Sequence, residues 1–97
     1  MQGLIWSPAS RADLHQIDSW LTERNPGAAV QILRAIRASS DRLREYPKIG
    51  RALDEPFRVL GVRHTNYLLV YRLVDDAVEI VRVRHAAENW FPVEGDI

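Results

Sequence analysis

The sequence predicts an α+β fold: an N-terminal strand, an antiparallel helical hairpin and then a three-stranded antiparallel meander, with the helices on one face of the sheet. Two observations carry this prediction. Apolar residues recur at helical spacing over about 8–24 and 26–46, and three strand-like runs joined by short turns follow them. The length of 97 residues and the 46% hydrophobic content suit a single domain spanning 1–97.

The ends of both helices are predicted from particular residues. Residues 4–6 read as a short strand, and Ser7 can then cap a helix whose first position is Pro8. The apolar stripe of this helix has the spacing expected of an amphipathic helix: Leu14, Ile17 and Leu21. Residues 25–27 (Asn-Pro-Gly) break the first helix, and Pro47 ends the second one near position 46. So short a connection predicts antiparallel neighbours.

Three strands are expected at 57–64, 66–74 and 77–85, with Gly61 as a candidate bulge in the first of them. Residues 65–66 and 75–77 are the expected turns. Simple alternation along the last strand sorts its side chains into two faces. One face carries Glu79, Val81, Val83 and His85, and the other carries Ile80, Arg82 and Arg84.

Composition excludes several classes of function. The formal net charge is zero, so no bulk positive field indicates nucleic-acid binding, and the absence of cysteine excludes disulfides and thiolate metal sites. The sequence contains no metal-ligand spacing and no phosphate-binding glycine loop, so we expect no metal and no cofactor. No apolar run approaches the length of a membrane span, and the start lacks a signal-peptide pattern, so we expect a cytoplasmic protein without a membrane partner.

Arginine supplies all but one of the cations, the exception being Lys48. Since the hairpin can cover only one side of the sheet, the other side is expected to present arginines to an anionic partner. The candidate partner-binding residues are Arg58, Arg63, Arg72, Arg82 and Arg84. Spacing alone favours the plainer interpretation, in which strand arginines are solvated and paired with Glu79, Asp75 and Asp76.

Histidines 64 and 85 are the candidate acid and base, although a lone histidine at a strand end more often has a structural role. If the protein is a catalyst, the candidate set is His85, Arg82 and Arg63. Residues 90–92 (Trp-Phe-Pro) are interpreted as an anchor that packs the C-terminus onto the body, with a partner-binding patch as the alternative.

Several local motifs stand in a recognisable order. They are Trp6-Ser7-Pro8 with Ala12-Asp13-Leu14, Pro26 with Ala28-Ala29, Pro47 with Gly50-Arg51, Tyr67 to Arg72, and Ile80 to His85. Their order and spacing resemble the RelE/ParE toxin superfamily of type II toxin–antitoxin systems over nearly the whole chain. One departure is Glu88, which stands where that family often has an arginine.

The resemblance implies a cognate antitoxin as partner, in an oligomeric complex, and one of two activities. ParE-like members poison DNA gyrase, whereas RelE-like members cleave messenger RNA on the ribosome without metal. The long second helix looks more like ParE. The chemistry agrees, because the sheet has no lysine, arginine is a poor acid or base, and alternation separates His85 and Glu79 from Arg82. We therefore predict a gyrase-directed binder without catalytic residues. The alternatives are an endonuclease and a degenerate member that only binds its antitoxin.

Overall fold

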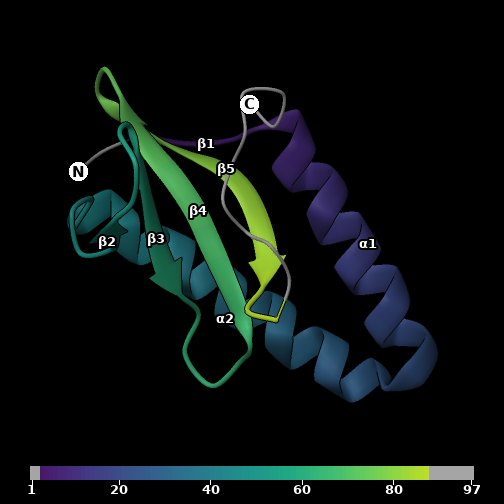
Figure 1. Cartoon of the computed structure of the whole chain (residues 1–97). Helices are drawn as coiled ribbons and strands as arrows, with labels where there is room; N and C mark the ends of the chain where they lie inside the picture. Colours follow the sequence, from purple (N-terminus) through teal and green to yellow (C-terminus); the bar gives the residue numbers. More distant parts are fainter. Residues whose placement is uncertain (1–2, 88–97) are drawn as a thin grey trace.

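The fold is that of a computed structural model, which describes residues 3–87. Its elements follow the order β1, α1, α2, β2, β3, β4, β5 (Figure 1). Their bounds are Gly3–Trp6 for β1, Pro8–Arg24 for α1, Pro26–Glu45 for α2, Arg51–Ala52 for β2, Phe57–Gly61 for β3, Tyr67–Val74 for β4 and Ala77–His85 for β5. Both predicted helices and the last two predicted strands are confirmed. The additional strand β2 has only two residues.

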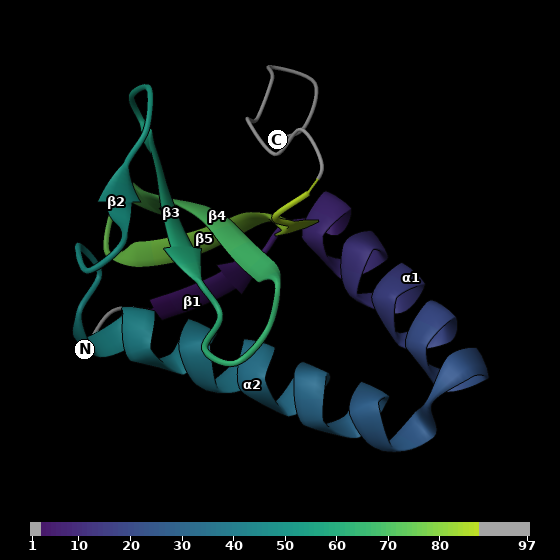
Figure 2. The same ribbon diagram turned by 60° about the horizontal axis from the view of Figure 1, so that its bottom comes forward.

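The strands form a mixed sheet in the order β1-β5-β4-β3-β2. Strand β1 runs parallel to β5, and the other pairs are antiparallel. Helix α2 lies across one face of the sheet, while α1 leaves β1 beside the β5 edge and diverges from α2 as an open V (Figures 1 and 2). The predicted α+β class, with an N-terminal strand, two helices and a mostly antiparallel sheet, is confirmed.

Each helix begins where its capping residue predicts. The Ser7 hydroxyl accepts a hydrogen bond from the backbone N–H of Ser10 at 3.0 Å, and the Asn25 side chain accepts one from Ala28 at 3.1 Å. A proline occupies the first turn in both cases, where its missing N–H costs nothing. Asn25 also ends α1, so one residue closes the first helix and caps the second.

The core lies between α2 and the sheet. Ile36 and Leu43 of α2 pack among fully or almost fully buried residues of the strands: Leu69, Tyr71, Val78, Ile80 and Val83. Leu14 and Ile17 of α1 are only partly buried against this cluster. Burial of apolar side chains drives folding, so α2 contributes more to the core than α1 does.

A β-bulge in β5 corrects the predicted faces. Val70 lies opposite Arg82 and Tyr71 lies opposite Ile80, so Val81 is an extra residue on β5. Simple alternation across it is therefore wrong. Glu79 shares a face with Arg82, and Ile80 shares the opposite, α2-facing side with His85. The bulge was expected at Gly61, which instead ends β3.

The expected anchor at 90–92 and the departure at Glu88 lie outside the described residues. Within residues 3–87, no helix is long and apolar enough to cross a membrane.

Candidate partner-binding site

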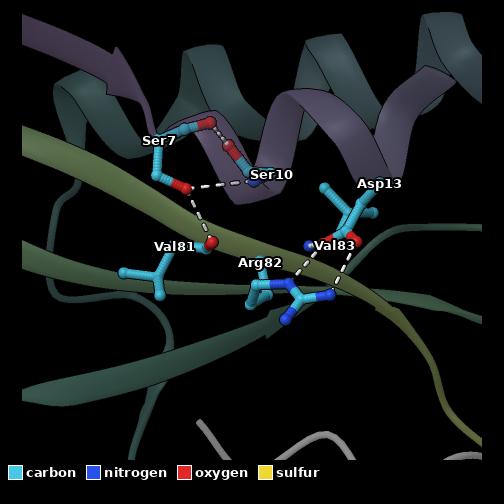
Figure 3. Close-up of polar contacts among 6 residues, drawn as sticks. All are labelled: Ser7, Ser10, Asp13, Val81, Arg82 and Val83. Carbon is cyan, nitrogen blue, oxygen red and sulfur yellow. Dashed lines mark hydrogen bonds and ion pairs between the residues drawn. The ribbon is translucent and has the colours of Figure 1, made fainter. Parts of the chain in front are cut away.

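Arg82 is held by a carboxylate from α1 (Figure 3). Its Nε and Nη2 atoms donate to Oδ2 and Oδ1 of Asp13, both at 2.8 Å, and the two side chains are only 16% and 10% exposed. The backbone N–H of Val83 donates to the same carboxylate at 2.9 Å. A bidentate pair of this kind fixes geometry as well as charge. Arg82 therefore joins α1 to β5 and is not simply presented to solvent.

The first turn of α1 continues the edge contact that β1 begins. β1 ends at Trp6, and Ser7 then donates through its hydroxyl to the Val81 carbonyl at 2.7 Å. Ser7 and Asp13 thus satisfy backbone groups of β5 beyond the last residue of β1. Sequence reasoning missed this arrangement. A signal was present, because Ser10 and Asp13 fall beside the apolar stripe of α1, and a carboxylate on a buried face requires a donor.

Arg72 is also paired within the fold. Its Nε lies 2.6 Å from Oε1 of Glu79 on the neighbouring strand, with the two side chains 27% and 18% exposed. Arg72, Arg82 and Arg84 lie on the side of β4 and β5 that faces away from α2, and we call this side the arginine face. For Arg72, the interpretation of a strand arginine paired with Glu79 is confirmed.

Arg58 lies elsewhere. It is opposite Tyr71 in the register, and thus on the α2 side of the sheet, where its Nη2 donates to the Lys48 carbonyl at 3.2 Å. Arg63 and His64 are exposed in the turn after β3, and His64 has a positive φ of 63°. The five candidate arginines are therefore not gathered on one surface.

Contacts of Tyr71 beside Arg58 hold the loop at 47–51 (Pro-Lys-Ile-Gly-Arg), and we call these contacts the Tyr71 corner. The Tyr71 hydroxyl donates to the Pro47 carbonyl at 2.8 Å and accepts from the Gly50 N–H at 2.9 Å. A Cβ at Gly50 would lie 2.5 Å from that hydroxyl and 2.8 Å from the Val59 carbonyl oxygen. Burial raises the pKa of Tyr71 above 10.0, partly opposed by the Gly50 hydrogen bond and by Arg58.

His85 occupies a structural environment. Its ring meets the Tyr67 ring edge-on at 5.3 Å between centroids, and its Nδ1 accepts from the Ala87 N–H at 3.1 Å. The register places it on the opposite side of the sheet from Arg82. The catalytic set of His85, Arg82 and Arg63 is therefore not brought together on one face.

An open groove between the helices was not predicted from the sequence. It has a volume of about 590 Å³ and is bounded by β1, α1 and α2. Its apolar residues are Leu4, Trp6, Leu14, Leu33 and Ile36. Its exposed polar rim consists of Arg11, His15, Asp18, Arg37 and Asp41, and the buried Ser40 also lines it. We call it the interhelical groove. The apolar stripes predicted the helices, but the crossing angle that opens the groove depends on packing.

Within the described part of the chain, no group of three or more histidine, aspartate or glutamate side chains is placed to hold a metal ion.

Comparisons with known proteins agree with this architecture. A protein-family model for the ParE toxin of type II toxin–antitoxin systems, parDE, matches residues 4–90. Toxin RelE3 of Caulobacter vibrioides is 33% identical over 92% of this chain and 99% of its own length. Toxin ParE1 of Mycobacterium tuberculosis H37Rv is 33% identical over 84% of this chain and 86% of its own length. A solved chain from the chromosomal ParDE system of P. aeruginosa has a TM-score of 0.78 at 20% identity, covering 88% of this chain and 96% of that one. From these matches we conclude that the chain belongs to the ParE toxin family of type II toxin–antitoxin systems.

Proposed function

We propose that this toxin acts in the cytoplasm by binding DNA gyrase, that it does not cleave messenger RNA, and that its cognate antitoxin neutralises it. The observation that carries the proposal is the engagement of Arg82 by Asp13 on α1. The family membership supports the toxin–antitoxin part. The gyrase part rests on the resemblance to ParE together with the chemistry of the arginine face.

Metal-free cleavage of RNA requires a base for the 2′-hydroxyl, a cation for the developing phosphorane and an acid for the leaving oxygen. Arginine can supply only the cation, because its pKa is too high for proton transfer at neutral pH. Arg82 and Arg72 already neutralise Asp13 and Glu79. A phosphate on the arginine face would therefore compete with two carboxylates.

Of the two candidate histidines, His64 is exposed in the turn after β3 and His85 is on the other side of the sheet from Arg82. His85 lies against Tyr67, and its Nδ1 accepts a hydrogen bond from the backbone. Positioned acid–base catalysis contributes about 10²–10⁴-fold, and only when the group reaches the reacting atom. This separation favours a protein that acts by binding.

The test is a supercoiling assay with purified toxin, purified gyrase and relaxed plasmid. We expect inhibition of supercoiling that increases with toxin concentration and is relieved by the antitoxin. Unchanged supercoiling at a toxin concentration that arrests growth in cells would contradict the gyrase assignment. If the toxin also fails to arrest growth, the chain is a member that only pairs with its antitoxin.

A second candidate, the ribosome-dependent endonuclease, is favoured by one observation. The bulge puts Glu79 on the same face as Arg72 and Arg82, and a carboxylate among cations is a possible general base. Several relatives also carry the name RelE. Growth arrest by Glu79→Gln separates the two candidates. A binding toxin retains the arrest, whereas an endonuclease that uses Glu79 loses it while the variant stays folded.

A further inference from the structure

The arginine face has an apolar centre. Val59 and Val70 are opposite each other in the register, on the side of the sheet that faces away from α2, and they are 4% and 0% exposed. Helix α2 lies against the other side of the sheet, and α1 lies beside β5 (Figure 2). Buried apolar side chains need close neighbours, because protein interiors are densely packed. The cover over this centre therefore does not come from α2, and α1 borders the face only along β5.

Arginines surround this centre. The register places four of them on this side of the sheet: Arg51, Arg72, Arg82 and Arg84. The carboxylates paired there are those of Asp13 and Glu79. Among the residues that the register and these ion pairs place on the face, arginines outnumber carboxylates by four to two. A complementary occupant therefore carries both carboxylates and apolar side chains.

The last ten residues of the sequence have this composition. Positions 88–97 read Glu-Asn-Trp-Phe-Pro-Val-Glu-Gly-Asp-Ile. They include three acidic side chains, two aromatic rings and no basic side chain. Such a segment complements an arginine-lined apolar surface in both charge and polarity.

The chain leaves the sheet at a point from which this segment reaches the face. Strand β5 ends at His85, and the Ala86 N–H donates to the Asn66 carbonyl at 2.7 Å, which fixes the exit beside the start of β4. Ten residues in extended conformation span up to about 33–36 Å. The eight residues of β4 cover about 27 Å. Residues 88–97 are therefore long enough to run back over the full length of β4.

We propose that residues 88–97 bind to the arginine face of their own chain and exclude polyanions such as RNA from it. Trp90 and Phe91 pack over the apolar centre, and the carboxylates of the segment lie beside the arginines. The segment is then an internal competitor for the surface that residue type alone assigned to an anionic partner. This inference goes beyond the proposed function and depends on neither gyrase nor the antitoxin.

The test compares two variants of the full chain that change the net charge equally. The tail variant neutralises the acidic segment: Glu88→Gln, Glu94→Gln and Asp96→Asn. The helix variant, its matched control, neutralises three exposed carboxylates of α1 and α2: Glu23→Gln, Asp41→Asn and Glu45→Gln. Any difference between the two variants therefore reports the position of the carboxylates and not the net charge.

The first measurement is acrylamide quenching of tryptophan fluorescence at low salt. The background is Trp20→Phe, because Trp20 is 53% exposed and would dominate the quenching. We expect weak quenching in this background and in the helix variant, and quenching about twofold stronger in the tail variant, because loss of its ion pairs frees Trp90. Equal quenching in all three proteins would overturn the proposed docking.

The second measurement is the affinity for a short fluorescein-labelled oligouridylate, followed by fluorescence anisotropy at low salt without ribosomes. We expect the tail variant to bind about tenfold more tightly than the wild type, and the helix variant to gain about twofold at most from its net charge. Trp90→Ala, which leaves the charge unchanged, should also bind more tightly than the wild type because it removes the apolar anchor.

Equal affinities of the tail and helix variants for the oligouridylate would overturn the exclusion of polyanions, even if Trp90 is shielded from acrylamide. Neither measurement contains gyrase or antitoxin. Failure of this proposal is therefore distinguishable from failure of the proposed function, which the supercoiling assay tests.

Discussion

The arginine face and the interhelical groove differ in how many of their charged side chains are paired within the fold. On the arginine face, Arg82 and Arg72 are paired with Asp13 and Glu79 at hydrogen-bond distance. In the groove, the side chains of Arg11, Arg37 and Asp41 have no hydrogen-bond or ion-pair partner within residues 3–87. Most of the apolar residues that line the groove are only partly buried. Arg72 and Arg82, which the sequence indicates as partner-binding residues, are thus the ones that form ion pairs within the fold.

This difference has a physical cause. A guanidinium near a sheet must be neutralised or solvated, since burying an unpaired charge is costly. The bulge and the placement of α1 bring a carboxylate to both Arg72 and Arg82. Rim residues on two diverging helices carry no such requirement, because water solvates their charges.

The largest effect should follow removal of the Asp13 carboxylate. Asp13→Ala leaves the mostly buried Arg82 guanidinium and the Val83 N–H without this acceptor, and loss of one partner of a buried pair costs about 3–5 kcal/mol. Urea denaturation followed by circular dichroism measures it. Asp13→Asn is the milder control, since its amide oxygen still accepts one hydrogen bond. A cost below about 1 kcal/mol for Asp13→Ala would mean that Arg82 does not serve the fold.

Gly50→Ala should have the next largest effect on stability. It tests the contacts around Tyr71, to which Arg58 belongs instead of to the arginine face. The new methyl group would collide with the Tyr71 ring and the Val59 carbonyl, and overpacking of this kind costs about 1–3 kcal/mol. Gly61→Ala is the matched control, because a Cβ there has no described heavy atom within 4 Å. Equal melting temperatures for the two variants would contradict the close approach at Gly50.

Tyr71 should make this corner sensitive to alkaline pH. Its folded pKa is raised above 10.0 by burial, so the folded protein holds the proton more tightly than the unfolded chain does. The stability contributed is complete below the unfolded value and is lost as the pH rises above it. Tyr71→Phe should cost about 1–3 kcal/mol at pH 8, since the Gly50 N–H and the Pro47 carbonyl lose their partner.

Urea denaturation of both proteins between pH 8 and pH 11 measures this dependence. The difference in stability between wild type and Tyr71→Phe should narrow as the pH rises above 10. A difference that stays constant over the range would show that Tyr71 is not desolvated as the corner requires.

The smallest effect on stability is expected in the groove. Arg37→Glu changes an exposed side chain without a partner, so the free energy of unfolding should change by less than about 0.5 kcal/mol. Thermal melting of this variant beside Arg34→Glu measures the change. A large loss of stability would place Arg37 in the fold and remove the contrast between the two surfaces.

The fold was largely predictable because its signals are local. Ser7 and Asn25 cap the helices through their own hydrogen bonds, and Pro8 suits the first turn because it has no N–H to satisfy. The apolar runs of β4 and β5 are typical of buried strands. The parallel pairing of β1 with β5 joins residues more than 70 positions apart and leaves no local mark.

The candidate site was less predictable for a related reason. One inserted residue, Val81, exchanges the faces of everything that follows it, so alternation misplaced Glu79 relative to Arg82. The Asp13–Arg82 contact and the interhelical groove depend on how α1 packs beside the sheet. Residue type indicated that arginines would meet carboxylates, but only the tertiary structure identifies which ones.

Primer extension on messenger RNA, incubated with ribosomes and the purified toxin, tests most directly whether the arginine face serves structure instead of phosphate chemistry. We expect no toxin-dependent cleavage at toxin concentrations that inhibit supercoiling. Specific cleavage within codons on the ribosome, abolished by Arg82→Ala or Glu79→Gln in variants that remain folded, would contradict it.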